Sequence, residues 1–331
     1  MSMLDVFRTD AFSMVSLTDA FIKAPHQPRR LGQLGLFGSK GIRTTTAVVE
    51  EKNGRLSLIA NTPRGGVAST IGAEKRTARS FVVPHFERES VILADELQGV
   101  RAFGSESETE AYQAVVAERM ADLRKMHEVT LEYHRMGAVK GQILDADGAT
   151  VIYNLFTEFG VTQQTHNIVL SSGATVVRDE AIAIQRKSES ELGDDMVTGY
   201  RAFCGDDFFD DLVAHASVTD SLKYQESNML RTDLRAGFEY GGITWENYRG
   251  TVGGTLFVPT GEAYVVPLGT SIFQTYYAPA DYLETVNTIG QPLYAKMVVD
   301  EQLQRWAKVH TQSNPLAICL RPRAIIKVTK S

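Results

Sequence analysis

Hydrophobic residues recur at steps of three and four along Glu106–Met136, a stretch without glycine or proline. That spacing predicts one amphipathic helix of about thirty residues, roughly 45 Å long. Ser105 with Glu108 fits a capping box, and Gly137 is the expected stop. Globular helices average only about 11 or 12 residues, so we interpret this one as a structural helix that extends beyond any single compact core. The alternative is a long core helix of a two-layer enzyme domain. The apolar stripe consists of Tyr112, Val115, Val116, Met120, Leu123, Met126 and Tyr133.

A second pattern, of β-rich runs around a turn signal, precedes the helix. Thr44–Glu51 and Arg55–Ala60 flank an Asn-Gly pair, which predicts a hairpin. The following residues 61–80 are poor in large aliphatics and partly basic, and a further strand-like run, Ser80–Glu87, closes the excursion. An isolated two-stranded ribbon is marginal in water, so we expect another molecule to order it. The candidate assembly-interface residues are Asn53, Gly54, Arg64, Lys75, Arg76 and Arg79.

Residues 1–40 lack the pattern of a domain. A short helix is expected at Ser16–Lys23, and prolines and glycines follow it. Gly32, Gly35 and Gly38 have the spacing of a nucleotide loop, but neither a strand before them nor a helix after them is predicted. We therefore interpret the segment as an extended arm with turns.

Downstream of the long helix, Val139–Phe159 is predicted to form a hairpin turning at Asp147-Gly148. Residues 165–192 look mostly helical. The pattern then changes to short strands, many glycines and aromatic-rich runs, which places a domain transition at about residues 193–200. The final strand, Ala317–Val328, is expected to return beside the long helix.

Composition is that of an ordinary globular protein. The 331 residues are 43% hydrophobic and 22% charged, enough for about two domains. No apolar run approaches the length of a membrane span, and Asp5 and Asp10 stand where a signal peptide would need apolar residues. Cys204 and Cys319 alone support neither a disulfide framework nor a metal knuckle, which fits a reducing compartment.

The charge balance bears on nucleic acid. There are 40 acidic against 34 basic residues, a net charge of −6, and no basic tail. A protein that coats phosphates needs clustered lysine and arginine. Any relation to nucleic acid is therefore expected to be indirect, through enclosure or exclusion.

Motifs for catalysis are incomplete. His127-Glu128 lacks the second histidine of a zinc-protease helix, and neither a phosphate-binding loop nor a nucleophile elbow occurs. Asp145-Ala-Asp147-Gly148 resembles the start of a calcium loop, but its glycine comes too early and Phe156 takes the position of the essential glutamate. We interpret it as a hairpin turn.

One acidic cluster lies on a predicted helix, at Asp206, Asp207, Asp210, Asp211 and His215. Asp211 and His215 share a helix face and could hold a metal. Carboxylates in a first turn also complement the helix dipole, and we favour that structural role. No catalytic, cofactor-binding or metal-binding residue is assigned.

A family resemblance is spread in order along nearly the whole chain. The segments that carry it are Phe203–His215, Phe238–Gly250, Phe273–Asn287 and Thr311–Cys319, preceded by Ser13–Ala20, Glu50–Gly54, Pro63–Gly66 and Tyr153–Gly160. They resemble the tailed-phage major capsid protein E family, the lambda-like major capsid proteins.

The resemblance implies an α+β chain with the Hong Kong 97-type capsid fold. The predicted extended ribbon would then lie on a neighbouring subunit, and the long helix would be the spine of the peripheral domain. The implied segments are an N-terminal arm (1–40), an extended loop (41–90), a peripheral domain (91–199) with spine helix 106–136, an axial domain (200–290) and a return to the peripheral domain (291–331).

The implied function is that of a tailed-phage major capsid protein, a non-enzyme whose hexamers and pentamers form an icosahedral shell around double-stranded DNA, without sequence-specific binding. Its expected locations are the virion and, during assembly, the host cytoplasm. Expected partners are further copies, a separate scaffolding protein and a portal protein; a cement or decoration protein is left open, and no membrane is involved. Some relatives form Lys–Asn crosslinks, for which no residue can be assigned here. The alternatives are a non-viral nanocompartment shell of the same fold and an unrelated soluble enzyme.

Overall fold

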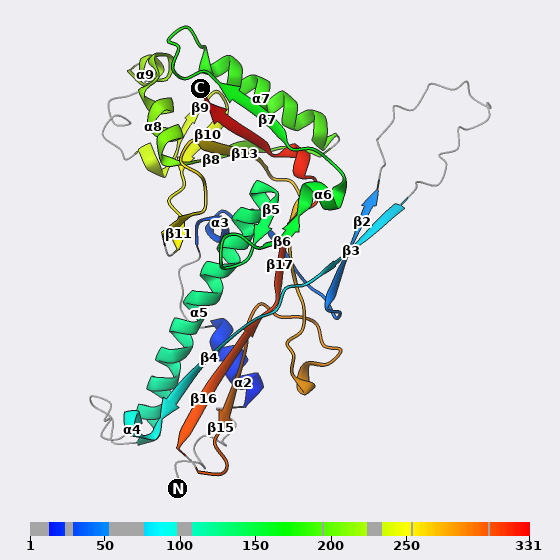
Figure 1. Ribbon diagram of the computed structural model, residues 1–331, viewed down its shortest axis with the longest axis vertical. Coiled ribbons are helices and arrows are strands. Elements are labelled where there is room, and N and C mark those ends of the chain that lie inside the picture. Colours follow the sequence, from blue (N-terminus) through cyan, green and yellow to red (C-terminus); the bar gives the residue numbers. More distant parts are fainter. Residues whose placement is uncertain are drawn as a thin grey trace, which may run out of the picture. The chain divides into compact units, whose positions relative to one another are not determined.

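The chain is a mixed α and β protein in two compact units (Figure 1). The computed structural model describes residues 13–23, 29–52, 76–97, 108–193, 195–223, 234–252, 254–303 and 305–331. The first unit contains the described residues up to Ala47, with Val82–Arg135 and Gln274–Ala317. The second contains those of Val48–Phe81, Met136–Phe273 and Ile318–Ser331. No helix within the described ranges has both the length and the hydropathy to cross a membrane.

The first unit is built on an antiparallel three-stranded sheet of order β15-β16-β4. A second small sheet has the order β1-β14-β17, with β1 parallel to β14. The elements that lie wholly or mostly in this unit are α2 (Met14–Lys23), α3 (Arg30–Gln33), β1 (Gly38–Gly41), β4 (Phe86–Leu93), α4 (Ala94–Leu97), α5 (Glu108–Lys140), β14 (Phe273–Tyr277), η4 (Leu283–Thr285), β15 (Tyr294–Val299), β16 (Trp306–Ser313) and β17 (Pro315–Cys319).

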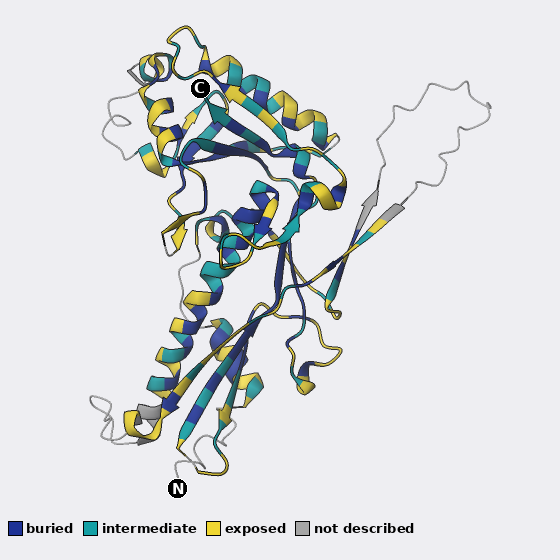
Figure 2. Ribbon diagram, in the orientation of Figure 1, coloured by how far each residue is buried: buried dark blue, intermediate teal, exposed yellow. Residues whose placement is uncertain are grey.

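One face of the β15-β16-β4 sheet forms the first core. Alternate residues of its strands, such as Ile92 and Val309, meet Val116 and Met120 of α5. Phe21 of α2 completes the cluster. Figure 2 colours the buried positions of the ribbon dark blue. This is the alternation expected when only one side of an antiparallel sheet is covered.

The predicted long helix is confirmed, with a corrected end. α5 runs through Gly137 to Lys140, and the chain leaves the helix at Gly141, whose φ is +80°. Gly137, Ala138 and Val139 are buried, so packing outweighs the cost of about 1 kcal/mol that glycine carries inside a helix. The proposed cap at Ser105 lies outside the described residues.

The apolar stripe is only partly right. Val116, Met120 and Leu123 are buried, but Met126 is 54% exposed. The helix also buries polar side chains, which a hydrophobicity pattern does not find. These are Arg124, His127, Glu132 and His134.

The predicted N-terminal helix is confirmed as α2, and it belongs to the first core. Leu17 and Phe21 are buried there, and the Thr18 hydroxyl accepts a hydrogen bond from the Ala295 amide at 3.1 Å. The Arg124 guanidinium donates to the carbonyls of Phe21 and Ile22, at 2.9 Å for Ile22. These are carbonyls of the last helical turn, which have no partner within a helix.

The second unit is organised around a mixed sheet of order β7-β18-β13-β8-β10-β9. β7 is parallel to β18 and β8 to β10, and the other neighbours are antiparallel. The elements are β5 (Gln142–Leu144), β6 (Val151–Asn154), α6 (Leu155–Phe159), β7 (Gln164–Ile168), α7 (Val177–Leu192), β8 (Gly199–Cys204), α8 (Asp206–Ala214), α9 (Ala216–Lys223), η3 (Leu234–Ala236), β9 (Phe238–Tyr240), β10 (Ile243–Asn247), β11 (Thr251–Val252), β12 (Thr255–Leu256), β13 (Glu262–Leu268), η5 (Pro322–Ala324) and β18 (Ile326–Lys330).

The second core contains a group of packed aromatic rings. The rings of Phe208 and Trp245 stack at 6.1 Å, and Phe209 meets Phe238 edge to face at 5.8 Å. Ile184 of α7 packs in the same cluster. This core holds the sheet against α7 and α8.

Two predictions for the second unit hold and two need correction. The hairpin at Asp147-Gly148 is confirmed as β5 and β6, and the helix near Asp206 as α8. The predicted helix over 165–192 is wrong at its start, because β7 pairs with β18 before α7 begins. The predicted strand 317–328 is two strands separated by Pro322, and the second, β18, lies between β13 and β7.

The ribbon before the long helix is described only at its base. β2 (Thr46–Lys52) pairs with β3 (Arg76–Val82). Residues 53–75 lie outside the described part, so the hairpin between Thr44–Glu51 and Arg55–Ala60 stays a prediction. The predicted strand Ser80–Glu87 divides between β3 and β4 at Pro84, which has no amide hydrogen to donate to a ladder.

Candidate assembly surfaces

Of the predicted interface residues, only Arg79 has a described side chain. Asn53, Gly54, Arg64 and Lys75 lie outside the described residues, and Arg76 is described only as the first residue of β3. The Arg79 guanidinium donates to the carbonyl of Glu158 and to that of Phe159, the latter at 3.3 Å. It also lies 5.3 Å from the centre of the Phe159 ring. Arg79 thus anchors β3 on its own chain, and its interface role stays a prediction.

The two faces of the ribbon differ. Phe81 is buried, and its ring lies 5.5 Å from Tyr153 and 5.9 Å from Phe159. Val48 and Val82 are instead 59% and 64% exposed. One face of the paired strands therefore packs on its own chain, and the other leaves aliphatic side chains uncovered.

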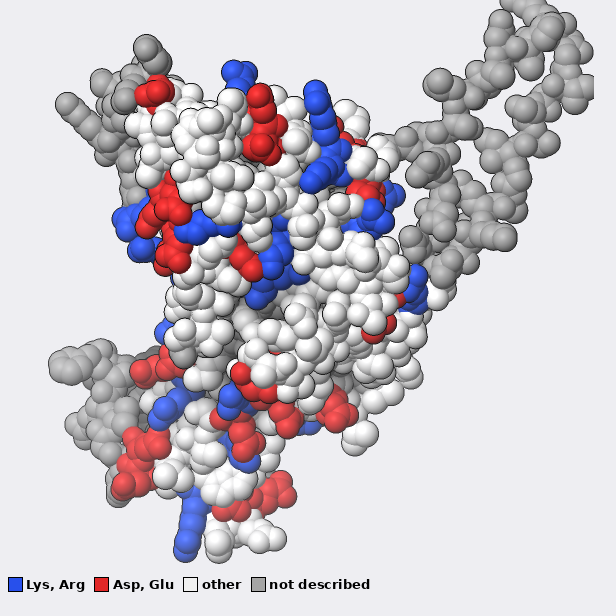
Figure 3. Space-filling model, turned by 45° about the horizontal axis from the view of Figure 1, so that its top comes forward, with Lys and Arg blue, Asp and Glu red and all other residues white. Residues whose placement is uncertain are grey.

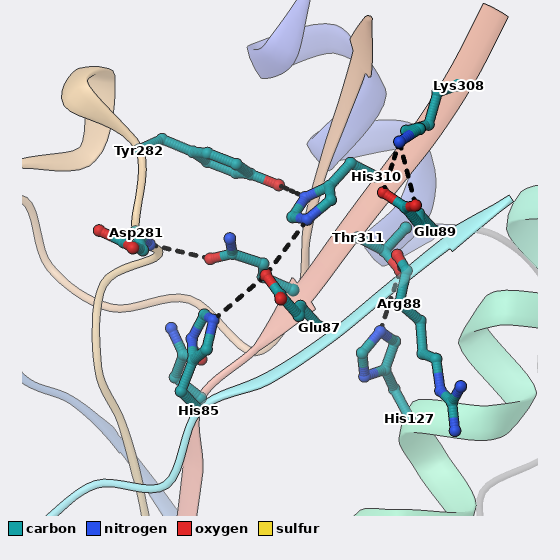
Figure 4. A network of polar contacts seen from close by, with 12 residues as sticks. His85, Glu87, Arg88, Glu89, His127, Asp281, Tyr282, Lys308, His310 and Thr311 are labelled. Carbon is teal, nitrogen blue, oxygen red and sulfur yellow. Dashed lines mark hydrogen bonds and ion pairs between the residues drawn. The ribbon is translucent and has the colours of Figure 1, made fainter. Parts of the chain in front are cut away.

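A surface loop, residues 278–290, connects β14 to β15 in the first unit. Its base is held to β16 and the residue after it by polar contacts (Figure 4). Asn314 donates to the carbonyl of Pro279 at 2.8 Å, and the Gln312 side chain accepts from the Asp281 amide at 2.8 Å. The Tyr282 hydroxyl lies 2.7 Å from His310 Nδ1. These contacts fix the loop on the sheet without using its aliphatic residues.

A glutamate links this loop base to β4. Glu87 Oε2 lies 3.3 Å from His310 Nε2 and 3.5 Å from His85 Nε2 (Figure 4). His85 Nδ1 donates to the Asn314 side-chain oxygen at 2.9 Å, because an amide oxygen can only accept. The two histidines, the glutamate and Tyr282 therefore form one network that orients the loop.

Beneath the sheet, His127 is buried in its neutral form. Thr311 donates its single hydroxyl hydrogen to the Arg88 carbonyl at 2.9 Å, so it accepts from His127 Nε2 at 3.0 Å. Burial lowers the pKa of His127 to about 4, and the positive charge of Arg88 adds to the effect. This histidine is a structural donor between α5 and β16.

The acidic cluster on α8 is used in local contacts. His215 donates from Nε2 to the Ser172 carbonyl at 3.0 Å, and its Nδ1 lies 2.9 Å from the Ser217 hydroxyl. Asp211 pairs with Lys330 at 2.6 Å, and Asp206 accepts from Asn247 at 3.0 Å. Among the described residues, no group of three or more His, Cys, Asp or Glu side chains is arranged to hold a metal ion.

The two cysteines of the chain lie inside the fold. Cys204 and Cys319 are buried free thiols, and burial raises the pKa of both, that of Cys319 to about 12.

Acidic and basic side chains intermingle on the face drawn in Figure 3. That face does not present the single-sign field typical of a phosphate-coating surface.

The loop 278–290 is what the sequence interpretation missed. Its residues lie partly inside Phe273–Asn287, a segment that carried the family resemblance. The available signal was a period of three in its polar and aliphatic residues, which matches neither an α-helix nor a strand.

Comparison with known proteins gives consistent matches. A family model described as phage major capsid protein E matches residues 13–330. The major capsid protein of Pseudomonas phage KPP10 is 29% identical over 339 residues, and that of Salmonella phage Felix O1 is 25% identical over 355, each alignment covering 96% of both chains. The capsid structure of cyanophage P-SCSP1u superposes with a TM-score of 0.53 at 11% identity, covering 93% of this chain and 90% of that one.

Proposed function

The chain belongs to the phage major capsid protein E family, and on that premise we propose that its copies assemble as hexamers and pentamers into an icosahedral shell around double-stranded DNA. It is a major capsid protein of tailed-phage type, and its α+β architecture is the Hong Kong 97-type capsid fold. The observation that carries the proposal is the extent of the family match, which runs from residue 13 to residue 330.

Within this shell, each segment takes the role that the family resemblance suggests. The ribbon of residues 41–90 reaches a neighbouring copy, α5 serves as the spine of a peripheral domain, and residues 200–290 form an axial domain near the capsomer axes. The uncovered face of β2 and β3, with Val48 and Val82 exposed, supports the role of the ribbon. Exposed aliphatic side chains gathered on one face are a feature of protein–protein contact sites.

The partners proposed are further copies of the chain, a separate scaffolding protein and a portal protein, with assembly in the host cytoplasm. The shell contains DNA without reading its sequence and without catalysis. The mixed charges of the surface in Figure 3 support enclosure rather than coating.

Electron microscopy and sedimentation of the expressed chain test the proposal, with and without a scaffolding protein from the same phage. We expect closed shells with five-fold and six-fold capsomers in at least one condition. A stable monomer in both conditions would contradict it. Shells that never contain DNA when produced with the full phage packaging machinery would favour the nanocompartment alternative.

A further inference from the structure

The loop after β14 has a repeating sequence. Residues 282–290 read Tyr-Leu-Glu, Thr-Val-Asn and Thr-Ile-Gly. The middle position of each triplet is aliphatic. A period of three suits a tight, 3₁₀-like course, in which residues three apart lie on the same side, and η4 forms at the start of the segment.

The residue at the first position of each triplet makes a polar contact within its own subunit. Tyr282 lies 2.7 Å from His310 Nδ1, and Thr285, only 3% exposed, donates to the Ala280 carbonyl at 2.6 Å. Thr288 donates to the Thr285 carbonyl at 2.7 Å. The side chains at all three first positions therefore make polar contacts within their own subunit.

The third position stabilises the course of the chain. Glu284 pairs with Lys296 at 2.7 Å, and Asn287 takes a left-handed conformation with φ of 61°. The Gly290 amide donates to the Ile42 carbonyl at 2.8 Å. With both ends and the inner side held, the loop is preorganised before any partner binds.

The middle positions are left to solvent. Leu283, Val286 and Ile289, named here the aliphatic knob, are 93%, 61% and 57% exposed. Single exposed aliphatics are ordinary on protein surfaces, but several on one rigid loop mark an interaction site. None of the three belongs to the two core clusters described above.

We propose that the aliphatic knob is a subunit–subunit contact, covered in the shell by a second copy of this chain. This inference rests on the proposed shell function. A stable pairwise interface uses roughly 20–30 residues a side, so three side chains are far too few to hold a separate partner protein. A second copy already positioned by other shell contacts meets the knob at high effective concentration, where a small contact is enough. Ring-forming subunits also need such one-sided, heterologous contacts.

Thiol labelling of Leu283→Cys tests the contact directly. The native Cys204 and Cys319 are fully buried, so they supply little background in the folded chain. We expect rapid labelling of free subunits and at least tenfold slower labelling once the same variant is assembled. The unsubstituted protein, treated in parallel, gives the background rate.

A charge substitution tests whether the contact matters for assembly. Leu283→Asp should leave the melting temperature of the free subunit within about 1 °C, because Leu283 is 93% exposed, and should lower shell yield at least tenfold. Met196→Asp is the matched control, since Met196 is 86% exposed and lies apart from the knob in sequence and in the second unit. Its shell yield should stay within twofold.

The outcomes separate the two proposals. If the unsubstituted chain forms shells and the introduced thiol of the Leu283→Cys variant is labelled equally fast in free and assembled subunits, the knob contact is overturned and the shell function stands. Equal loss of shells from Leu283→Asp and Met196→Asp would overturn it too, because any new surface charge would then suffice. Failure of the unsubstituted chain to form shells under any condition would overturn both.

Discussion

The two cores of the molecule are stabilised differently. The second unit buries an aromatic cluster, with Phe208 stacked on Trp245 between α8 and the six-stranded sheet. The first unit covers one side of a three-stranded sheet with mostly aliphatic residues, and its helix α5 adds the buried polar groups Arg124 and His127. The first core therefore depends on specific hydrogen bonds as well as on apolar area. The second unit also buries hydrogen-bonded polar groups, such as Ser188 and Glu246. Because burial lowers the pKa of His127, the first core should be more sensitive to acid than the second.

The largest effect is expected from truncation in the aromatic core. Trp245→Ala removes a fully buried ring, together with the hydrogen bond from its Nε1 to the Tyr240 carbonyl at 3.1 Å. Deleting a large buried aromatic costs about 3–5 kcal/mol of unfolding free energy. Denaturant unfolding measures the loss of unfolding free energy. Hydrogen exchange should show the accompanying loss of amide protection in the second unit. Equal loss of protection in the first-unit strands would show that the two cores unfold as one.

A charge in the aliphatic core should be nearly as damaging. Val116→Asp places a carboxylate without a partner at a side chain only 3% exposed, which costs about 3 kcal/mol or more. Glu118→Gln is the matched control on the exposed side of the same helix and should stay within about 0.5 kcal/mol. Thermal melts of the two variants check this. Similar melting temperatures would mean that the helix faces the other way.

The polar part of the first core is tested by Arg124→Met. Methionine keeps an unbranched apolar stem but removes the donor to the Phe21 and Ile22 carbonyls. Leaving such groups unpaired costs about 1–3 kcal/mol, and we expect α2 to be released before the rest of the unit unfolds. Hydrogen exchange at Leu17–Phe21 measures the release. Unchanged protection there would show that the contacts of Leu17, Thr18 and Phe21 hold α2 without Arg124.

The same core should weaken in acid through His127. Its folded pKa of about 4 lies below the ordinary histidine value of 6.5, so between these values the unfolded chain binds a proton that the folded chain does not. Unfolding free energy should therefore fall as pH drops from 6.5 towards 4, by about 2 kcal/mol at pH 5.

His127→Gln isolates this contribution. Glutamine retains an amide donor for Thr311 and does not titrate. Its stability curve should run flatter than that of the unsubstituted chain over this pH window, whatever its absolute stability. Parallel curves would contradict a neutral buried His127.

The sequence could predict these elements better than their contacts. The long helix followed from its period, but its end was placed at Gly137 because propensity alone favours a stop there; burial of Gly137–Val139 carries the helix on to Gly141. Buried Arg124 and His127 could not be found, since their partners are backbone carbonyls and a hydroxyl supplied by distant segments. The pairing of β2 with β3 could not be found either, because an Asn-Gly pair is a local signal and this pairing joins segments more than twenty residues apart.

The proposed contact surfaces contribute little to either core. The knob is exposed, and Val48 and Val82 of the ribbon project away from the buried Phe81. Folding and assembly should therefore depend on different residues.

Replacing residues 53–75 by a short Gly-Ser link, which leaves β2 and β3 in place, tests the separation most directly. Changes in surface-loop length carry modest entropic terms, so the subunit should remain folded. Circular dichroism should match that of the unsubstituted chain, while sedimentation with scaffold present should show no closed shells. An unfolded variant would mean that the segment belongs to the subunit's own fold, and normal shells would mean that it makes no essential contact.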